Sequence, residues 1–436
     1  MASGKFTSRD KIRPGAYFNF QSGKKTTGVN ASGIIAMTAP LDWGTPNTFV
    51  EITSQTNLVA ATGRDVEESK MLLVREALKT AQKVLLFNVA GITSSKSNAQ
   101  INADLTIEAV KFGVLGNEIK VVIDELLDGT FTVSTYFRNS LVDTQNISST
   151  DAFKSNDYIE ITGAGDLEEV AGVILSGAST EAPTNDNYVE YLKALELKDF
   201  YAFCIDTADA TIKQTAINYT KKWRDAEGKK VVFISAEVAA DYEGVVNVGN
   251  GVELANGVKL TALQCTPYIA GEMASAGITK SLTYHIYEGA VDANPRMLQS
   301  DIEDALRKGE LIFTRNQNNV VVEQDINSLT TVTDIKNTYF KKNKIIRIID
   351  TLNTELLKVY SNSFIGQISN DEDGRELLKK DILVLLDEFK DNNALNDYES
   401  EDVEVIAGQD KDVVIVNMAI SVADAMEKMY VTVTLN

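Results

Sequence analysis

The sequence predicts a multidomain protein that combines α/β and α+β structure: a layered α/β core, a small all-β domain inserted into it, and a C-terminal α+β domain. Strand–helix–strand spacing recurs on both sides of residues 93–183 and indicates a parallel sheet covered by helices. Residues 93–183 instead contain short runs of alternating strand pattern, which are separated by Gly, Asn and Asp turns. At 436 residues the chain should divide into roughly two to four domains.

We predict four parts, in chain order. Residues 1–23 form an N-terminal arm, residues 24–92 and 184–330 form the α/β core, and residues 93–183 form the inserted β domain. Residues 331–436 form the C-terminal domain.

The core elements follow from apolar patterns. Residues 84–89 form a continuous apolar run, as expected of a strand buried on both faces, and a helix over 66–81 precedes it. After the insertion, helices are expected over 188–195 and 210–226, with strands at 200–205 and 231–234.

The other two domains have different patterns. In the insertion, Asp128-Gly129 is a hairpin signal between predicted strands at 119–123 and 131–136. In the C-terminal domain, apolar residues at 4-3-4-3 spacing predict a long amphipathic helix: Ile345, Ile349, Leu352, Leu356 and Val359. A second helix over 377–389 and strands at 403–406 and 413–422 follow it.

Both ends of the chain have the pattern of short strands without a partner of their own. Residues 16–21 and 429–435 alternate apolar and polar side chains, which is typical of half-buried strands. A lone strand gains hydrogen bonds by joining the edge of another sheet. The alternative, that each terminus docks into its own domain, fits the pattern equally well.

Composition excludes several classes of function. The net charge of −20, from 62 acidic and 42 basic residues, opposes nucleic-acid binding. No secretory signal opens the sequence and no run approaches the about 18 apolar residues of a transmembrane helix, so we expect cytoplasmic synthesis and no membrane insertion. Cys204 and Cys265 are interpreted as buried structural thiols.

The sequence offers almost no candidate catalytic residues. The one histidine, His285, has no nucleophile motif beside it and is interpreted as structural. Asp371-Glu372-Asp373-Gly374 lacks the ligand spacing of a calcium loop, and the glycine-rich stretch 249–257 lacks the Lys-Ser/Thr of a phosphate loop. We therefore expect no catalytic, cofactor-binding or metal-binding residue, and no cofactor.

One stretch of the chain is strongly basic. Between residues 335 and 349 there are five cations and no acid: Lys336, Lys341, Lys342, Lys344 and Arg347. Such a run is usually a solvated face. On so acidic a protein it is also a candidate docking site for an acidic partner.

Taken together, several segments resemble contractile tail sheath proteins, of the compact kind found in myoviruses, phage-like particles of Gram-positive bacteria and R-type bacteriocins. The resemblance covers nearly the whole chain. It is carried by Arg13-Pro14-Gly15-Ala16-Tyr17-Phe18-Asn19-Phe20, Leu41-Asp42-Trp43-Gly44, Phe112-Gly113-Val114-Leu115-Gly116-Asn117-Glu118-Ile119, Asp325-Ile326-Asn327-Ser328-Leu329-Thr330, Asn362-Ser363-Phe364-Ile365-Gly366, and Val422-Ala423-Asp424-Ala425-Met426-Glu427-Lys428-Met429-Tyr430.

The resemblance implies a mechanism. Subunits form hexameric rings that stack helically around a tail tube and contract without nucleotide hydrolysis. Each subunit's two terminal strands join a sheet in the C-terminal domains of its neighbours. The exchanged residues would be Ala16, Tyr17, Phe18, Asn19, Phe20, Met429, Tyr430, Val431, Thr432, Val433 and Leu435, and the receiving strands would carry Val403, Val405, Val414, Val416 and Met418.

The implied partners are other copies of the chain, the tail tube protein, and baseplate and tail-terminator proteins. The basic run at 336–347 is then the candidate contact with the tube. Two other classes of function stay open: an α/β hydrolase-like enzyme, which the missing nucleophile–histidine pair argues against, and a monomeric adhesin or baseplate module.

Overall fold

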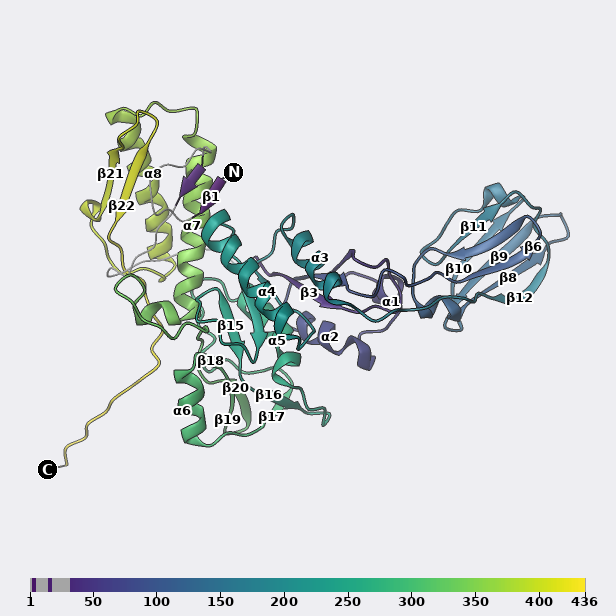
Figure 1. The fold of residues 1–436 in the computed structure, drawn as a ribbon, viewed down its shortest axis with the longest axis horizontal. Helices are drawn as coiled ribbons and strands as arrows, with labels where there is room; N and C mark the ends of the chain where they lie inside the picture. The colour runs from purple at the N-terminus through teal and green to yellow at the C-terminus, as the bar shows by residue number, and fades with distance from the viewer. Residues whose placement is uncertain (1, 5–14, 18–31, 436) are drawn as a thin grey trace. The chain divides into compact units, whose positions relative to one another are not determined.

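The computed structural model describes residues 2–4, 15–17 and 32–435 (Figure 1). The chain divides into two compact units. The first comprises Met1–Ile35, Glu76–Gln82 and Asp199–Asn436, and the second comprises Ala36–Arg75 and Lys83–Lys198.

The first unit contains a layer of parallel strands covered by helices. The strands β13 (Ala202–Phe203), β14 (Val232–Ala236), β15 (Val245–Val248) and β18 (Glu310–Leu311) pair in that order. Every residue of β14 and β15 is buried, which explains their mostly apolar sequences, interrupted only by Ser235 and Asn247. The parallel α/β layer predicted for the core is confirmed, although the strand predicted at 200–205 is only two residues long.

The helices of this layer begin where the sequence caps them. Asp209 accepts hydrogen bonds from the backbone N–H groups of Thr211 and Ile212 at the start of α4 (Ala210–Lys221), which continues into the π-helical turn η4 (Lys222–Glu227). A capping box formed by Thr261 and Gln264 starts α5 (Ala262–Ser275), which contacts β13, β14 and β15.

Smaller elements complete the core of the first unit. The pairs β16 (Gly251–Leu254) with β17 (Ala290–Asn294), and β19 (Phe313–Asn316) with β20 (Asn319–Val322), are antiparallel. The helix α6 (Gln299–Arg307) precedes β18. The glycine-rich stretch 249–257 thus contains a strand of the first of these pairs.

The C-terminal part of the first unit is α+β, as predicted. After η5 (Thr338–Lys341) come the helices α7 (Asn343–Ser363) and α8 (Glu372–Asp391), the turn η6 (Ser400–Asp402), and a hairpin of β21 (Val403–Ala407) and β22 (Val414–Met418). Apolar residues of all four main elements form one core, which includes Leu352, Leu356, Leu386, Phe389 and Val403. The strand predicted at 413–422 ends at Met418.

The second unit contains a β-sandwich. A four-stranded antiparallel sheet has the order β10 (Ser140–Ile147), β9 (Phe131–Phe137), β8 (Ile119–Glu125), β12 (Val170–Ile174), and a three-stranded sheet has the order β11 (Ile159–Gly163), β7 (Leu105–Ala109), β6 (Asn98–Asn102). Alternating residues of both sheets form a common core. The inserted all-β domain is confirmed, and Gly129 occupies the predicted hairpin turn with φ +79°.

The rest of the second unit consists of three neighbouring strands and several short helices. The strands β3 (Ile34–Ala39), β5 (Lys83–Asn88) and β4 (Phe49–Ile52) are neighbours in that order. They are accompanied by α1 (Leu58–Thr62), η1 (Ser69–Met71), α2 (Leu72–Leu78), η2 (Val114–Glu118) and α3 (Asn185–Leu195). The single helix predicted over 66–81 is therefore two shorter ones. The short turn η3 (Thr150–Ala152) lies after β10.

Candidate assembly surfaces

The predicted receiving strands form a hairpin whose outer edges pair with no other described strand. Val403 lies opposite Met418, Val405 opposite Val416, and Ala407 opposite Val414. Among the described residues, β21 and β22 pair only with each other. A two-stranded ribbon is marginal by itself, and its outer edges present backbone donors and acceptors that a further strand can satisfy.

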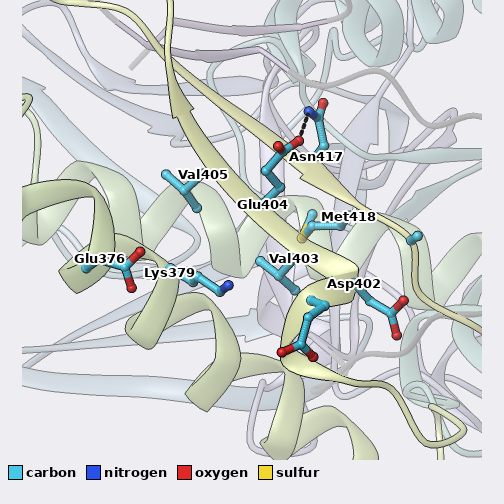
Figure 2. Close-up of a pocket in the computed structure, with 10 residues that line it drawn as sticks. Glu376, Lys379, Asp402, Val403, Glu404, Val405, Asn417 and Met418 are labelled. Atoms are coloured by element: carbon cyan, nitrogen blue, oxygen red, sulfur yellow. Dashed lines mark hydrogen bonds between the residues drawn. The ribbon is translucent and has the colours of Figure 1, made fainter. Parts of the chain in front are cut away.

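A groove lies between this hairpin and α8 (Figure 2). Its volume is about 550 Å³, and its lining is mostly acidic or apolar: Glu376, Lys379, Glu401, Asp402, Val403, Glu404, Val405, Asn417, Met418 and Ala419. Glu404 accepts a hydrogen bond from the Asn417 amide at 2.9 Å. No ion pair within the described residues neutralises the four carboxylates, so the groove is a negatively charged surface.

The described part of the N-terminal strand has a partner in its own chain, as in the alternative that the sequence pattern left open. The strand β2 (Gly15–Tyr17) pairs in parallel with β1 (Ala2–Gly4), with Ala16 opposite Ser3. The backbone of β2 lies beside α7. Phe18, Asn19 and Phe20 lie outside the described residues, so their proposed exchange remains a prediction.

The C-terminal segment is extended but forms no strand. Figure 1 shows it leaving the body of the first unit in yellow. Met429, Tyr430, Val431, Val433 and Leu435 expose between 67% and 92% of their surface, and Thr432 is also exposed. A strand needs a neighbouring edge for its hydrogen bonds, and none of the described residues supplies one here.

The residues just before this exposed segment, by contrast, are held by hydrogen bonds and ion pairs of Asp424 and Glu427, and we call residues 424–427 the arm root. The Glu427 carboxylate accepts hydrogen bonds from the Thr283 hydroxyl at 2.9 Å, the Gln324 amide at 2.9 Å, and the Lys342 ammonium at 2.7 Å. Lys342 Nζ also lies 2.7 Å from Asp424 Oδ2. Burial alone would raise the pKa of Glu427, but the hydrogen bonds from Lys342 and Gln324 lower it.

Behind the root lies a buried polar network centred on Asp325. Its carboxylate accepts from the Leu282 N–H at 2.9 Å, from Asn343 Nδ2 at 2.9 Å and from Arg347 Nη2 at 3.0 Å. The Asp325 N–H donates to the Thr283 hydroxyl at 2.9 Å, and this hydroxyl donates in turn to Glu427. The arm root is thus linked through hydrogen bonds to α7.

The five candidate tube-contact cations are mostly engaged within the subunit. Lys336 Nζ lies 2.5 Å from Glu243, Lys341 Nζ donates to the Thr330 carbonyl at 2.9 Å, and Lys342 holds the arm root. Lys344 and Arg347 expose only 5% and 2% of their surface. Burial lowers the pKa of Lys344. This burial argues against direct contact of Lys344 and Arg347 with another protein.

In the second unit, the segment Leu41-Asp42-Trp43-Gly44 packs against the segment 112–119, and we call this contact the joint of the second unit. The Gly44 N–H donates to the Phe112 carbonyl at 2.9 Å, and the Leu115 N–H donates to the Asp42 carbonyl at 3.1 Å. Gly113 has φ +112°, and a Cβ there would lie 2.1 Å from the Asp42 carbonyl oxygen. Only glycine permits this approach.

Trp43 fills the centre of that joint. Its side chain is fully buried in the β-sandwich core, with ring centroids 5.6 Å from Phe137 and 6.0 Å from Tyr158, and its indole N–H donates to the Ala60 carbonyl at 3.2 Å. The sequence prediction assigned this tryptophan to the α/β core, within residues 24–92, and missed its role in the inserted domain.

Charged residues reinforce the same joint from outside. Asp42 pairs with Arg64 and with Lys70, and Glu68 pairs with Arg64 at 2.7 Å and with Arg138 at 2.5 Å. The hydrogen bond from Arg138, followed by that from Arg64, lowers the pKa of Glu68 to about 2.

The residues considered for chemistry have structural surroundings. His285 Nε2 lies 2.8 Å from Glu272 Oε1. Cys204 and Cys265 are buried free thiols, and burial raises the pKa of each to about 12, as predicted for structural cysteines. Within the described residues, no helix is long and apolar enough to cross a membrane.

Family models cover almost the entire chain. Residues 32–89 match the N-terminal region of domain III of tail sheath protein Gp18, and 92–180 match the phage tail sheath β-sandwich domain. Residues 181–328 match the phage tail sheath central domain, and 335–436 match the phage tail sheath C-terminal domain. The chain belongs to the phage tail sheath family.

Full-length relatives agree with this assignment. The chain is 34% identical to the phage-like element PBSX protein XkdK of Bacillus subtilis, with all of both chains covered. The crystal structure of a sheath tail protein from Desulfitobacterium hafniense is 36% identical, with a TM-score of 0.82 over 96% of this chain and 99% of that one.

A distant relative shares the fold. The helical sheath of the anti-feeding prophage in its contracted state is 12% identical, with a TM-score of 0.59 over 99% of this chain and 100% of that one. As a tail sheath family member, this protein is a structural component of a phage tail or phage-like tail particle.

Four of the six quoted family segments meet in two regions. Residues 41–44 contact 112–119, and Asp325 of 325–330 is linked through Thr283 to Glu427 of 422–430. Sequence reasoning missed the Glu427 anchor. The available signal was charge: Asp424 and Glu427 are the acids nearest the end of a chain whose basic run, 336–347, contains no acid.

Proposed function

We propose that this sheath protein polymerises as hexameric rings that stack helically around a tail tube, and that the polymer contracts without nucleotide hydrolysis to drive the tube through a target cell envelope. The observation that carries the proposal is a complementarity. Among its described residues, one molecule presents both a hairpin with unpaired edges and an exposed, alternating segment of strand length.

In this proposal, residues 429–435 of one copy and residues 16–20 of another each add a strand to the hairpin of a third. An added strand of this length makes roughly four to six backbone hydrogen bonds, each contributing about 0.5–1.5 kcal/mol. Full burial of an apolar side chain such as Val431 or Leu435 contributes roughly 1.5–3 kcal/mol more. Such a contact joins different surfaces of successive copies, which produces a helical polymer.

The two arms differ in charge, and this supports assigning them to different edges. Residues 1–25 carry six cations against one acid, whereas residues 429–436 carry no charged side chain. The groove beside β21 is acidic. We therefore place the N-terminal arm at the β21 edge and the uncharged C-terminal strand at the β22 edge.

In this proposal, contraction needs no nucleotide hydrolysis. Exchanged strands keep neighbours connected while rigid bodies rotate and slide, and the extended polymer is higher in free energy than the contracted one. The energy is stored when the sheath assembles on its tube in the host cytoplasm.

The proposed partners are further copies of the chain, the tail tube protein, and baseplate and tail-terminator proteins. Since Lys344 and Arg347 are buried and Lys342 holds the arm root, the proposed tube contact rests on Lys336 and Lys341. We retain the division into an arm at 1–23, a core at 24–92 and 184–330, a β domain at 93–183 and a C-terminal domain at 331–436.

Alternation in the C-terminal strand provides a matched test. Val431 and Val433 share one face, and Thr432 and Thr434 share the other. Replacing both valines by Asp should abolish hollow polymers in electron micrographs of the purified protein, because charge would enter the receiving sheet. Replacing both threonines by Asp, with the same added charge, should weaken polymerisation far less.

Two results would contradict the proposal. Equal loss of polymers in both double variants would mean that added charge, and not a particular face, is responsible. Normal polymers from the Val431→Asp, Val433→Asp variant would exclude strand exchange by this segment.

A further inference from the structure

Glu427 is held at the start of the exposed C-terminal segment, although Met426 before it and the residues after it are exposed. The Glu427 side chain exposes 9% of its surface, whereas Met429 exposes 86% and Tyr430 exposes 92%. Residues 428–435 therefore form the free arm, and Glu427 is the last residue anchored to the body.

The anchor joins three parts of the first unit that are distant in sequence. Its donors come from the loop after α5 (Thr283), from the segment after β20 (Gln324), and from the residue before α7 (Lys342). One carboxylate oxygen accepts from Thr283, and the other accepts from both Gln324 and Lys342. All three donors must face an acceptor, which is what an ionised carboxylate offers.

The anchor also connects to the interior. Thr283 links Glu427 to the Asp325 backbone, and Asp325 is bonded to Arg347 and Asn343 on the first turns of α7. The Arg347–Asp325 pair is almost completely buried, at 3% and 1% side-chain exposure. A force applied to the arm at residue 428 would therefore be transmitted to α7 through these hydrogen bonds and through the Lys342 backbone.

We propose that Glu427 is a positioning residue for the C-terminal arm, and that its three-donor clamp fixes where the arm leaves the subunit and passes tension on the arm into α7. The inference rests on the proposed exchange of residues 429–435 between copies. Without the clamp, tension would peel the chain back toward Asp424, which pairs with Lys342 at 2.7 Å, and Ala423, whose N–H is bonded to the Ala394 carbonyl. The arm would then be longer and its exit undefined.

Glu427→Gln tests the clamp with little change in shape. The amide retains one acceptor oxygen, so at least one donor would face an NH₂ group. Lys428→Gln is the matched control, because it changes the neighbouring residue, which is exposed, and also alters one charge.

The readout is trypsin cleavage of the unassembled full-length subunit, followed by mass spectrometry. To measure the same bond in all variants, Met429→Lys is introduced into each background, including the Lys428→Gln control, and cleavage after residue 429 is followed. Cleavage after Lys411, in the exposed turn of the β21–β22 hairpin, is the internal reference. Losing a charge-assisted hydrogen bond should raise the rate at residue 429 about tenfold or more in Glu427→Gln.

Each outcome decides the question. A selective increase at residue 429 in Glu427→Gln, absent in Lys428→Gln, supports the clamp. An unchanged rate, an equal increase at Lys411, or an equal increase in the control overturns it. Since this assay uses unassembled subunits, it can fail while polymerisation by strand exchange holds, and it can succeed while polymerisation fails.

Discussion

Arg224 and Asp350 form a two-bonded ion pair in the interior of the first unit, with Nη1–Oδ2 and Nη2–Oδ1 distances of 2.8 and 2.7 Å. Their side chains are 5% and 3% exposed. The pair fastens η4, at the end of α4, to the first turns of α7. Arg224 Nη1 also donates to the Val231 carbonyl at 2.9 Å, which fixes the guanidinium in place.

We predict that Asp350→Asn lowers the free energy of unfolding of the first unit by about 3–5 kcal/mol, because it leaves the Arg224 charge buried without its counter-ion. Urea unfolding followed by Trp223 fluorescence measures this in a Trp43→Phe background, which leaves one tryptophan. Glu355→Gln is the control on the same helix: its partner Lys358 is largely exposed, and the loss should stay below about 0.5 kcal/mol. Equal losses in the two variants would contradict the prediction.

Trp43→Ala should destabilise the β-sandwich by about 3–5 kcal/mol, because it empties the centre of a packed core. Hydrogen exchange of the β8 and β9 amides is the measurement, and faster exchange there is expected. Leu127→Ala, at an exposed hairpin tip, should leave these amides unchanged. If β8 and β9 keep their protection in Trp43→Ala, the joint does not support the sandwich.

Acid should weaken the charged joint of the second unit. Hydrogen bonds from Arg138 and Arg64 hold the pKa of Glu68 at about 2, against an ordinary value of 4.5. A carboxylate with a lowered pKa in the folded state contributes stability above its unfolded pKa, and this contribution disappears as the pH falls toward about 2.

The melting temperature should therefore fall between pH 5 and pH 2.5, and Glu68→Gln should show a shallower fall over the same range. Glu67→Gln, at a neighbouring exposed glutamate, serves as the control. Parallel curves for wild type and Glu68→Gln would mean that Glu68 makes no pH-dependent contribution.

Lys341→Glu should reduce the fraction of tubes carrying sheath while leaving sheath polymerisation intact, since the proposed tube contact is electrostatic. Within the subunit, the substitution removes a hydrogen bond to the Thr330 carbonyl. Co-assembly with the tail tube protein, counted in micrographs, is the measurement, with Lys358→Glu on α7 as the control. Undiminished decoration of tubes would exclude Lys341 from the contact.

Elements with strong local patterns were predictable from sequence. The run at 84–88 is β5, the Asp128-Gly129 signal is a hairpin turn, and the 4-3-4-3 spacing from Ile345 to Val359 lies on α7. In each case, neighbouring residues determine the structure through side-chain period or turn conformation. The β21–β22 hairpin was predictable for the same reason.

The remaining features depend on contacts between distant segments. Trp43 follows a proline-containing loop, and nothing near it in sequence indicates that Phe137 and Tyr158 surround it. Arg347 was assigned to a solvated or docking face by the charge run, whereas Asp325 and two backbone carbonyls bury it. Residues 429–435 have a strand pattern, but a strand also requires an edge, and the described residues of the subunit provide none for this segment.

The helix α7 is continuous from Asn343 to Ser363, a length of about 31 Å at 1.5 Å per residue. Its first turns are fastened to the core by Arg347 and Asp350, and its later turns are part of the apolar cluster under the hairpin. It contains neither proline nor glycine, and so has no built-in bend. The helix can therefore act as a rigid connection. A rotation that a neighbouring subunit applies to the hairpin would be transmitted through α7 to the core.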